Sequence, residues 1–175
     1  MKIVVLSASP RKNSNTQLAM KHVFDYTKLK QADVKYINLA EDQVECYRGP
    51  DEKYNEATKN AASEIMEADV WLIGSPIYNS FFSSALKNLF EYVNYKNTEG
   101  KVAGMVIMAA GNIGFIDVQT LITQLLSYFR VITNPKAVFL TTDSISDNGV
   151  FDESSIKRLN EMVDGTLKMG LNLQK

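Results

Sequence analysis

Residues 7–17, with the sequence SASPRKNSNTQ, gather hydroxyl, amide and guanidinium groups into one polar stretch. The stretch follows four apolar residues, Ile3 to Leu6, and contains no large apolar side chain. A strand-to-helix connection in an α/β unit needs only about 2–6 residues, so this one is long for its place. The free N–H groups and the dipole at the start of the following helix favour a bound anion. We interpret the stretch as a phosphate-binding loop, and a solvated polar loop is the alternative.

The side chains of this loop suit a phosphate monoester better than a longer phosphate chain. Arg11 can offer a planar fork of donors to phosphate oxygens. The loop lacks both the GxxxxGK[ST] pattern of nucleoside triphosphate sites and the GxGxxG pattern of dinucleotide sites. We therefore predict a mononucleotide phosphate. The candidate contacts are Ser9, Arg11, Ser14, Asn15 and Thr16.

A second stretch, GSPIYNS at residues 74–80, follows the apolar run 70–73 and is predicted to be a loop. Pro76 has no N–H group, which leaves the N–H groups of Ile77, Tyr78 and Asn79 to face the edge of a planar heterocycle. Tyr78 could wall one side of that ring. The alternative is a turn that ends a strand, with Tyr78 in the core.

A third stretch, AAGNIG at residues 109–114, ends another apolar run with two glycines. Glycine lets the backbone approach a ligand closely, so this loop would face the opposite edge of the same ring. The pattern is weak by itself, and a plain turn is the alternative.

The elements that must position these loops alternate between strands and helices. Short Val- and Ile-rich runs predict five strands, at residues 3–6, 33–39, 70–73, 102–110 and 137–140. Apolar residues at helical spacing lie between them, most clearly in segments 86–93 and 118–129. Alternation of this kind predicts a doubly wound parallel sheet of order 2-1-3-4-5 with helices on both faces. In that order a ligand binds at the carboxyl ends of the first and third strands.

Composition excludes several classes of function. We expect one domain over residues 1–175, and 19 basic against 20 acidic residues leave a charge of −1, with no footprint for nucleic acid. One cysteine, Cys46, and one histidine, His22, leave no internal disulfide and no metal site to predict. The N-terminal apolar run is too short for a signal peptide, and no segment is long enough to span a membrane. We expect a cytoplasmic protein.

The three loops, in this order and spacing, resemble the NAD(P)H-dependent FMN reductase family of flavodoxin-like proteins. The resemblance runs nearly end to end. It is carried by SASPRKNSNT at 7–16, EADVWLIGSPIYNS at 67–80, ALKNLFEYV at 85–93 and GKVAGMVIMAAGNIG at 100–114. Two departures from the family are Ile77, where many relatives carry Glu, and the stretch SFFSS at 80–84.

The resemblance implies a role for each loop in binding FMN. The first loop would hold the phosphate, the second would line the isoalloxazine, and the third would pass its pyrimidine edge. Phe81 and Phe82 would crowd or cover the flavin face. The implied cofactor contacts are Ser9, Arg11, Ser14, Asn15, Thr16, Pro76, Ile77, Tyr78, Asn79, Gly111, Asn112 and Gly114.

The resemblance also implies a reaction. NAD(P)H would be the co-substrate and give a hydride to N5 of FMN, and a small acceptor would then take the electrons in a ping-pong cycle. The acceptor would be a quinone, an azo compound, a nitroaromatic or a flavin. No catalytic acid or base is required. The alternatives are an electron carrier of the flavodoxin type, which the charge of −1 disfavours, and a phosphate-binding module without flavin.

Relatives of this kind often place the flavin near a subunit boundary. We therefore expect a homodimer or a tetramer. Tyr92 and Tyr95 lie off the apolar stripe of the segment 84–95, and they are the expected dimer surface.

Overall fold

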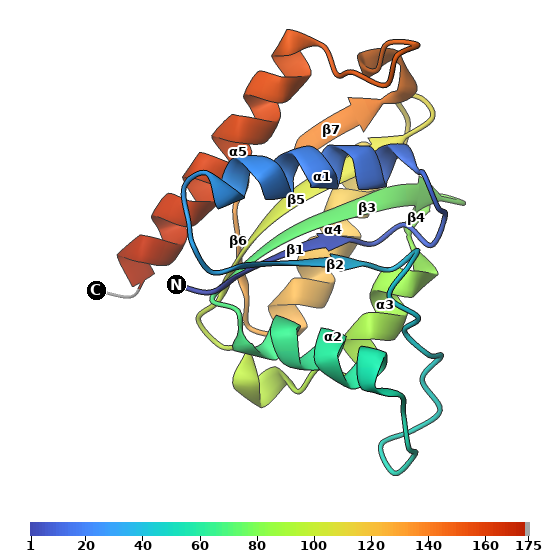
Figure 1. The fold of residues 1–175 in the computed structure, drawn as a ribbon, viewed down its shortest axis with the longest axis vertical. Coiled ribbons are helices and arrows are strands. Elements are labelled where there is room, and N and C mark those ends of the chain that lie inside the picture. The colour runs from blue at the N-terminus through green and yellow to red at the C-terminus, as the bar shows by residue number, and fades with distance from the viewer. Residues whose placement is uncertain (174–175) are drawn as a thin grey trace.

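A computed structural model of the chain describes residues 1–173, in which a parallel sheet lies between two layers of helices (Figure 1). Four strands form the body of the sheet in the spatial order β2, β1, β3, β5. Adjacent strands among these four run parallel, and the first residues of β1, β2 and β3 lie in register. The strands are β1 (Ile3–Ser7), β2 (Val34–Asn38), β3 (Val70–Tyr78) and β5 (Val102–Ala109).

The fifth position of the sheet is divided between two strands. Both β6 (Ile132–Thr133) and β7 (Val138–Thr141) pair in parallel with β5, at opposite ends of it. Pro135 lies between them and has no N–H group to donate to a ladder, so the pairing is interrupted there. The predicted order of five parallel positions is confirmed. The predicted count of five strands is wrong, because this division and the short β4 bring the count in the sheet to seven.

The stretch 74–80 is a strand and hairpin rather than the predicted loop. Pairing with β5 extends β3 as far as Pro76, which lies opposite Met108. Asn79 and Ser80 then adopt positive φ angles of 49° and 63°, the backbone of a tight two-residue hairpin turn. The chain returns as β4 (Phe81–Phe82), antiparallel to the end of β3. The N–H group of Tyr78 therefore belongs to a paired strand and not to an open loop.

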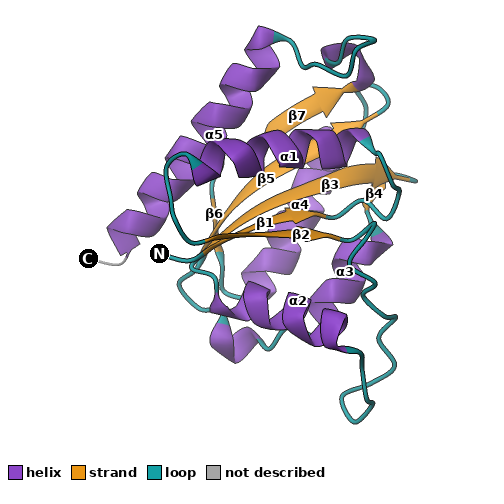
Figure 2. Cartoon of the chain, viewed as in Figure 1, coloured by secondary structure: helices purple, strands orange, loops and turns teal. Residues whose placement is uncertain are grey.

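The helices cover the sheet in two layers (Figure 2). One apolar cluster joins the sheet to α1 (Asn15–Lys28) and α5 (Glu153–Leu173). The other joins it to α2 (Glu56–Glu67), α3 (Ser84–Glu91) and α4 (Phe115–Tyr128). The predicted stripes are confirmed, since Leu86, Leu89, Phe90, Val118, Ile122 and Leu126 are all buried. No helix in residues 1–173 is both long enough and apolar enough to cross a bilayer.

Two glycines let the helices approach the sheet closely. A Cβ atom on Gly74 would meet the buried side chain of Met20 in α1. A Cβ atom on Gly104 would lie 2.5 Å from both Met162 Sδ and Thr166 Oγ1 in α5. α1 and α5 therefore pack closely on the sheet at Gly74 and Gly104, where the strands carry no side chain.

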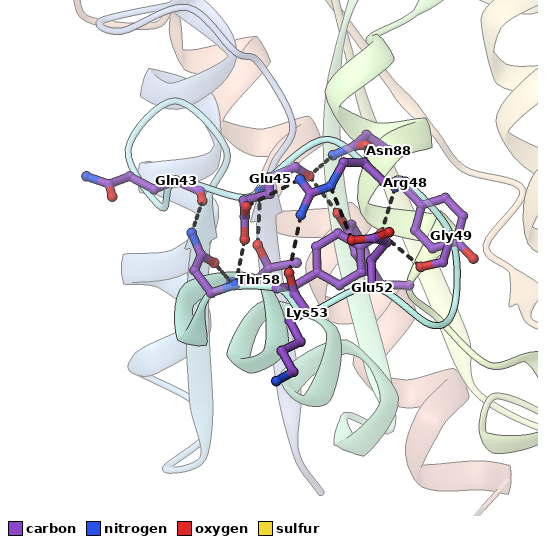
Figure 3. Close-up of polar contacts among 12 residues, drawn as sticks. Gln43, Glu45, Arg48, Gly49, Glu52, Lys53, Thr58 and Asn88 are labelled. Carbon is purple, nitrogen blue, oxygen red and sulfur yellow. Dashed lines mark hydrogen bonds and ion pairs between the residues drawn. The ribbon is translucent and has the colours of Figure 1, made fainter.

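The long connection between β2 and α2 is held against α3 by polar contacts (Figure 3). The carbonyl of Glu45 accepts hydrogen bonds from Asn88 Nδ2 at 2.8 Å and from the Tyr92 hydroxyl at 2.7 Å. Asn88 Oδ1 accepts from the N–H group of Tyr47 at 2.9 Å. The Tyr92 hydroxyl is therefore engaged within the chain, while Tyr92 and Tyr95 both stay half-buried, and their place on a dimer surface stays a prediction.

Candidate cofactor-binding cleft

A cleft of about 380 Å³ lies at the carboxyl edge of the sheet, where β1, β3 and β5 end. Its volume is near the lower end of the range of about 300–1,000 Å³ for small-molecule sites. The N-terminus of α1, the end of β3 and the end of β5 form its walls. The lining residues are Arg11, Asn13, Ser14, Asn15, Thr16, Pro76, Ile77, Tyr78, Met108, Ala109, Ala110 and Thr142.

The start of α1 forms an anion-binding end of this cleft. Ser14 is the N-cap, and its hydroxyl accepts from the N–H group of Gln17 at 3.1 Å. The N–H groups of Asn15 and Thr16 precede the first intrahelical bond and have no partner within the helix. The first turn of α1 carries no acidic residue. The exposed Arg11 borders the same space, so backbone donors and a cation lie at the same cleft.

Ser9 was predicted as a phosphate contact, but the structure places it behind the loop. Its side chain is buried, and it does not line the cleft. Its hydroxyl accepts from the N–H group of Arg11 at 3.2 Å and lies 3.3 Å from the Tyr78 hydroxyl. Ser9 therefore ties the predicted phosphate loop to the end of β3.

Ser83 forms a second buried contact between distant parts of the chain, and its long-range partner could not be predicted from the sequence. Its hydroxyl donates to the carbonyl of Ala8 at 2.5 Å, and its N–H group donates to Ser75 Oγ at 3.2 Å. Ser83 is also the N-cap of α3, a role that a serine before a helical stripe suggests. The contact across 75 residues could be known only from the fold.

The other end of the cleft is mostly apolar. Pro76, Ile77 and Tyr78 line it from β3, and Met108, Ala109 and Ala110 line it from the end of β5. The hydroxyl of Thr142 donates to the carbonyl of Ala110 at 3.2 Å and closes the remaining side.

Four predicted contacts lie at or beyond the edge of this space. Asn79 is in the exposed hairpin turn. Gly111, Asn112 and Gly114 follow the lining residue Ala110, but they are not themselves among the residues that line the cleft. Gly114 has a φ angle of 83° and caps α4, and a Cβ atom there would lie 3.8 Å from Ile77 Cδ1.

Five lining residues were missed by the sequence prediction. They are Asn13, Met108, Ala109, Ala110 and Thr142. In the sequence, the two alanines and Met108 are indistinguishable from the core residues of a strand, because their side chains have no polar group that would indicate a ligand. Thr142 reaches the cleft only because β7 ends beside β5, where Ala109 lies opposite Thr141.

Phe81 and Phe82 leave the cleft uncovered. Phe82 belongs to the apolar core, and Phe81 is 46% exposed on the hairpin. Neither residue lines the cleft, so a contact of Phe81 or Phe82 with a bound ring stays a prediction.

The chemistry of the cleft fits a phosphate with a planar uncharged body. Arg11 is the only charged side chain among the lining residues, and no carboxylate or histidine lines the cleft within residues 1–173. His22 lies elsewhere, where its Nε2 atom is 2.9 Å from Asn160 Oδ1, and Cys46 is exposed on the connection before α2. The described residues contain no group of three or more His, Cys, Asp or Glu side chains that could hold a metal ion.

The sequence of this chain is similar to those of known flavin reductases. Residues 1–144 match the family model described as NADPH-dependent FMN reductase. The NAD(P)H-dependent FAD/FMN reductase of Geobacillus thermodenitrificans is 26% identical over 128 residues, which cover 73% of this chain and 69% of that protein. The NADPH azoreductase of Bacillus sp. strain OY1-2 is 25% identical over 155 residues, which cover 88% of this chain and 84% of that protein.

Solved structures share the fold. The apo form of the NADH:FMN oxidoreductase EMOB superposes with a TM-score of 0.79 at 17% identity, covering 98% of this chain and 89% of that one. FerB, a flavoenzyme NAD(P)H:(acceptor) oxidoreductase from Paracoccus denitrificans, gives a TM-score of 0.78 at 20% identity, covering 98% of this chain and 97% of that one.

Proposed function

The chain belongs to the NADPH-dependent FMN reductase family, and on this premise we propose that it binds FMN in the cleft and uses NAD(P)H to reduce a small acceptor. The observation that carries the proposal is the chemical difference between the two ends of the cleft. Arg11 and the start of α1 lie at one end, and an uncharged, mostly apolar wall lies at the other. A flavin mononucleotide has the matching pair of features, a phosphate and a planar ring system.

We assign the cofactor contacts by their place in the cleft. Arg11, Ser14 and the N–H groups of Asn15 and Thr16 would hold the phosphate. Pro76, Ile77 and Tyr78 would lie against the ring system, and the backbone of residues 111–114 would pass its edge. Ser9 would act as a positioning residue, because its hydroxyl supports Arg11 and Tyr78.

Bound FMN would supply the redox chemistry, taking a hydride from NAD(P)H at N5 and releasing two electrons to the acceptor. The chain would orient the reactants and exclude water. NAD(P)H loses a hydride and becomes NAD(P)⁺, and an acceptor such as a quinone gains that electron pair and two protons, one of them from water. No lining carboxylate or histidine is needed to move a proton, which agrees with the uncharged wall beside β5.

The open face of the cleft supports sequential use of one site. Neither Phe81 nor Phe82 lines it, so the nicotinamide and then the acceptor would reach the same ring face. This arrangement predicts ping-pong kinetics with a quinone, an azo compound, a nitroaromatic or a free flavin. Initial rates at several fixed acceptor concentrations should give parallel double-reciprocal lines, and intersecting lines would contradict one shared face.

The proposed function is tested by anaerobic addition of NADPH or NADH to protein loaded with FMN. Bleaching of the flavin absorbance within seconds, followed by recovery when an acceptor is added, is the expected result. A bound flavin that dithionite bleaches and neither nicotinamide does would favour an electron carrier. A protein that takes up no FMN would favour a phosphate-binding module without flavin.

We further propose that residues 1–175 act as one FMN-binding domain in the cytoplasm and assemble as a homodimer or tetramer. The outer face of α4 supports assembly better than α3 does. Asp117 is the only charged residue in α4, and Ile116 is 64% exposed. Ile113, just before the helix N-cap Gly114, is 86% exposed.

A further inference from the structure

A second and larger cavity, of about 590 Å³, lies beside the cleft, between α1 and the edge strand β2. We call it the α1–β2 groove. Asn13, Ser14 and Asn15 line both spaces, so the groove and the cleft meet across the first turn of α1. The remaining lining residues of the groove are Gln17, Leu18, Lys21, Phe24, Tyr36, Asn38, Glu41 and Gly149.

The groove has an apolar and aromatic wall. Leu18 and Phe24 line it from α1, and Tyr36 lines it from β2. The rings of Phe24 and Tyr36 pack against each other with centroids 5.2 Å apart and planes inclined by 47°. Leu18 is 36% exposed, so its apolar side chain is open to a ligand in the groove. A flat heterocycle is the kind of ligand that such a wall accepts.

Polar groups without partners lie at the base of the groove. Asn38 is 97% buried, being 3% exposed, and its Oδ1 atom accepts from the N–H group of Ala40 at 3.2 Å. Its Nδ2 atom has no hydrogen-bond partner within residues 1–173, and neither has the hydroxyl of Tyr36. Buried polar atoms are normally satisfied, so the Asn38 amide and the Tyr36 hydroxyl, which both line the groove, call for a ligand or water.

The Tyr36 hydroxyl can act as a donor throughout the physiological pH range. Burial raises the pKa of Tyr36 to about 12, and the nearby Ser7 hydroxyl opposes that shift only in part. The Tyr36 hydroxyl and the Asn38 amide can both donate hydrogen bonds to the ring nitrogens of a purine.

Charged groups at the rim suit a phosphate linked to such a base. Arg11 and Lys12 are exposed on the loop between the two spaces, and Lys21 lines the groove. Lys21 is paired with Asp25, but both side chains are 57% exposed, so this pair is weak and easily exchanged. Glu41 also lines the groove, and its carboxylate accepts from Gln17 Nε2 at 3.1 Å. An exocyclic amino group could approach that carboxylate.

We propose that the α1–β2 groove holds the adenosine end of NAD(P)H while the nicotinamide occupies the cleft. This inference rests on the proposed function. A cleft of about 380 Å³ that already holds FMN cannot enclose a whole dinucleotide, so the rest of NAD(P)H must extend beyond it. The groove shares Asn13, Ser14 and Asn15 with the cleft, and it has an aromatic wall, free donors and nearby cations.

The test uses a variant that fills the groove and a matched control on the same helix. Leu18→Trp places a large ring in the groove, whereas Leu29→Trp adds the same ring at the other end of α1, where Leu29 is 84% exposed. Calorimetric titration with 5′-AMP, which carries no nicotinamide, is the direct readout. The expected result is AMP binding to wild type and to Leu29→Trp, and binding at least 10-fold weaker to Leu18→Trp.

A kinetic arm separates the groove from the cleft. Reduced nicotinamide mononucleotide lacks the adenosine half, so Leu18→Trp should raise KM for NADPH at least 10-fold and leave KM for the mononucleotide within about twofold. Equal effects on both substrates, or AMP affinities that match in all three proteins, would overturn the proposal. A protein that binds no FMN would instead refute the proposed function, and the AMP titration would still decide the groove.

A milder variant guards against misfolding of Leu18→Trp. Tyr36→Phe removes only the unpaired hydroxyl and keeps the aromatic wall. AMP binding should weaken several-fold with unchanged FMN content, and unchanged AMP affinity would count against the groove.

Discussion

Arg11 is the charged residue that borders the cleft, and the phosphate assignment depends on it. A charge-assisted hydrogen bond is worth about 1.5–3 kcal/mol, and exposure of Arg11 favours the lower end of that range. Arg11→Ala should therefore weaken FMN binding about 10-fold, as measured by quenching of flavin fluorescence. Lys12→Ala, at the exposed neighbour that does not line the cleft, is the control and should change FMN affinity less than twofold.

Ser83 acts on the cleft without touching it. Because its hydroxyl bonds the carbonyl of Ala8 and caps α3, Ser83→Ala should destabilise the protein by about 1–3 kcal/mol in urea unfolding. The apparent affinity for FMN should fall as well, since Ala8 leads into the phosphate loop. Ser84→Ala, one residue later on the exposed side, should alter neither quantity, and similar losses in both variants would contradict the role of Ser83.

The sequence identified some site residues and missed others for a physical reason. Arg11, Ser14, Asn15 and Thr16 carry polar groups at or just before the start of a helix, so their chemistry is visible in the sequence. All four line the cleft. Met108 was missed because it lines the cleft through its position at the end of β5, and its side chain carries no polar group that would indicate a ligand. Ser9 has the expected chemistry, but its buried position follows from the turn that it makes with Arg11.

Among the elements, α5 depends on its seat against β5. Gly104→Ala would push a Cβ atom against Met162 and Thr166, both buried, and overpacking of this kind costs about 1–3 kcal/mol. Gly111→Ala is the control, because a Cβ atom there meets nothing within 4 Å. Urea unfolding of the proteins without added FMN should separate the two, and an equally stable Gly104→Ala would contradict the close packing.

The N-terminus of α5 predicts a pH dependence. The Ser154 hydroxyl and the Ser155 N–H group hold the pKa of Asp152 at about 2, below its usual value of 3.8. Because the folded pKa is the lower one, Asp152 stabilises the fold above about pH 4, and that contribution disappears as pH falls towards 2.

Thermal unfolding of Asp152→Ala should therefore approach that of wild type as pH falls from about 5 to 2. Asp152→Asn keeps a capping side chain without a titrating group, so its difference from wild type should shrink over the same window. A gap between Asp152→Ala and wild type that stays constant with pH would contradict the capping role.

Element types could be read from the sequence because burial on both faces leaves continuous apolar runs and helical stripes. The extent of β3 could not be read in the same way. Pro76 resembles a strand end, yet pairing with β5 continues to this residue, and the turn at Asn79 and Ser80 then folds β4 back. Such tertiary pairing overrides the local signal, and the division of β6 from β7 at Pro135 has the same origin.

At the scale of the whole molecule, the order of the parallel positions brings the loop after β1 and the carboxyl end of β3 together. That juxtaposition followed from the alternation of elements in the sequence. The surface for assembly could not be predicted from the sequence in the same way. The hydrogen bond between the Tyr92 hydroxyl and the Glu45 carbonyl depends on how the connection before α2 folds back.

Assembly through α4 is testable with a charge on its uncharged face. Ile116→Lys should shift the protein to a monomer in sedimentation velocity at micromolar concentration, because burying an unpaired charge in an interface is costly. Leu173→Lys places the same charge on an exposed residue at the end of α5 and should leave the assembly unchanged. A wild-type protein that sediments as a monomer would refute the proposed dimer.

The central claim is that the start of α1 and Arg11 hold FMN by its phosphate. Parallel fluorescence titrations with FMN and with riboflavin, which has the same ring system and no phosphate, test this claim most directly. Several charge-assisted contacts of about 1.5–3 kcal/mol predict that FMN binds at least about 100-fold more tightly than riboflavin. Equal affinities for the two flavins would contradict the claim.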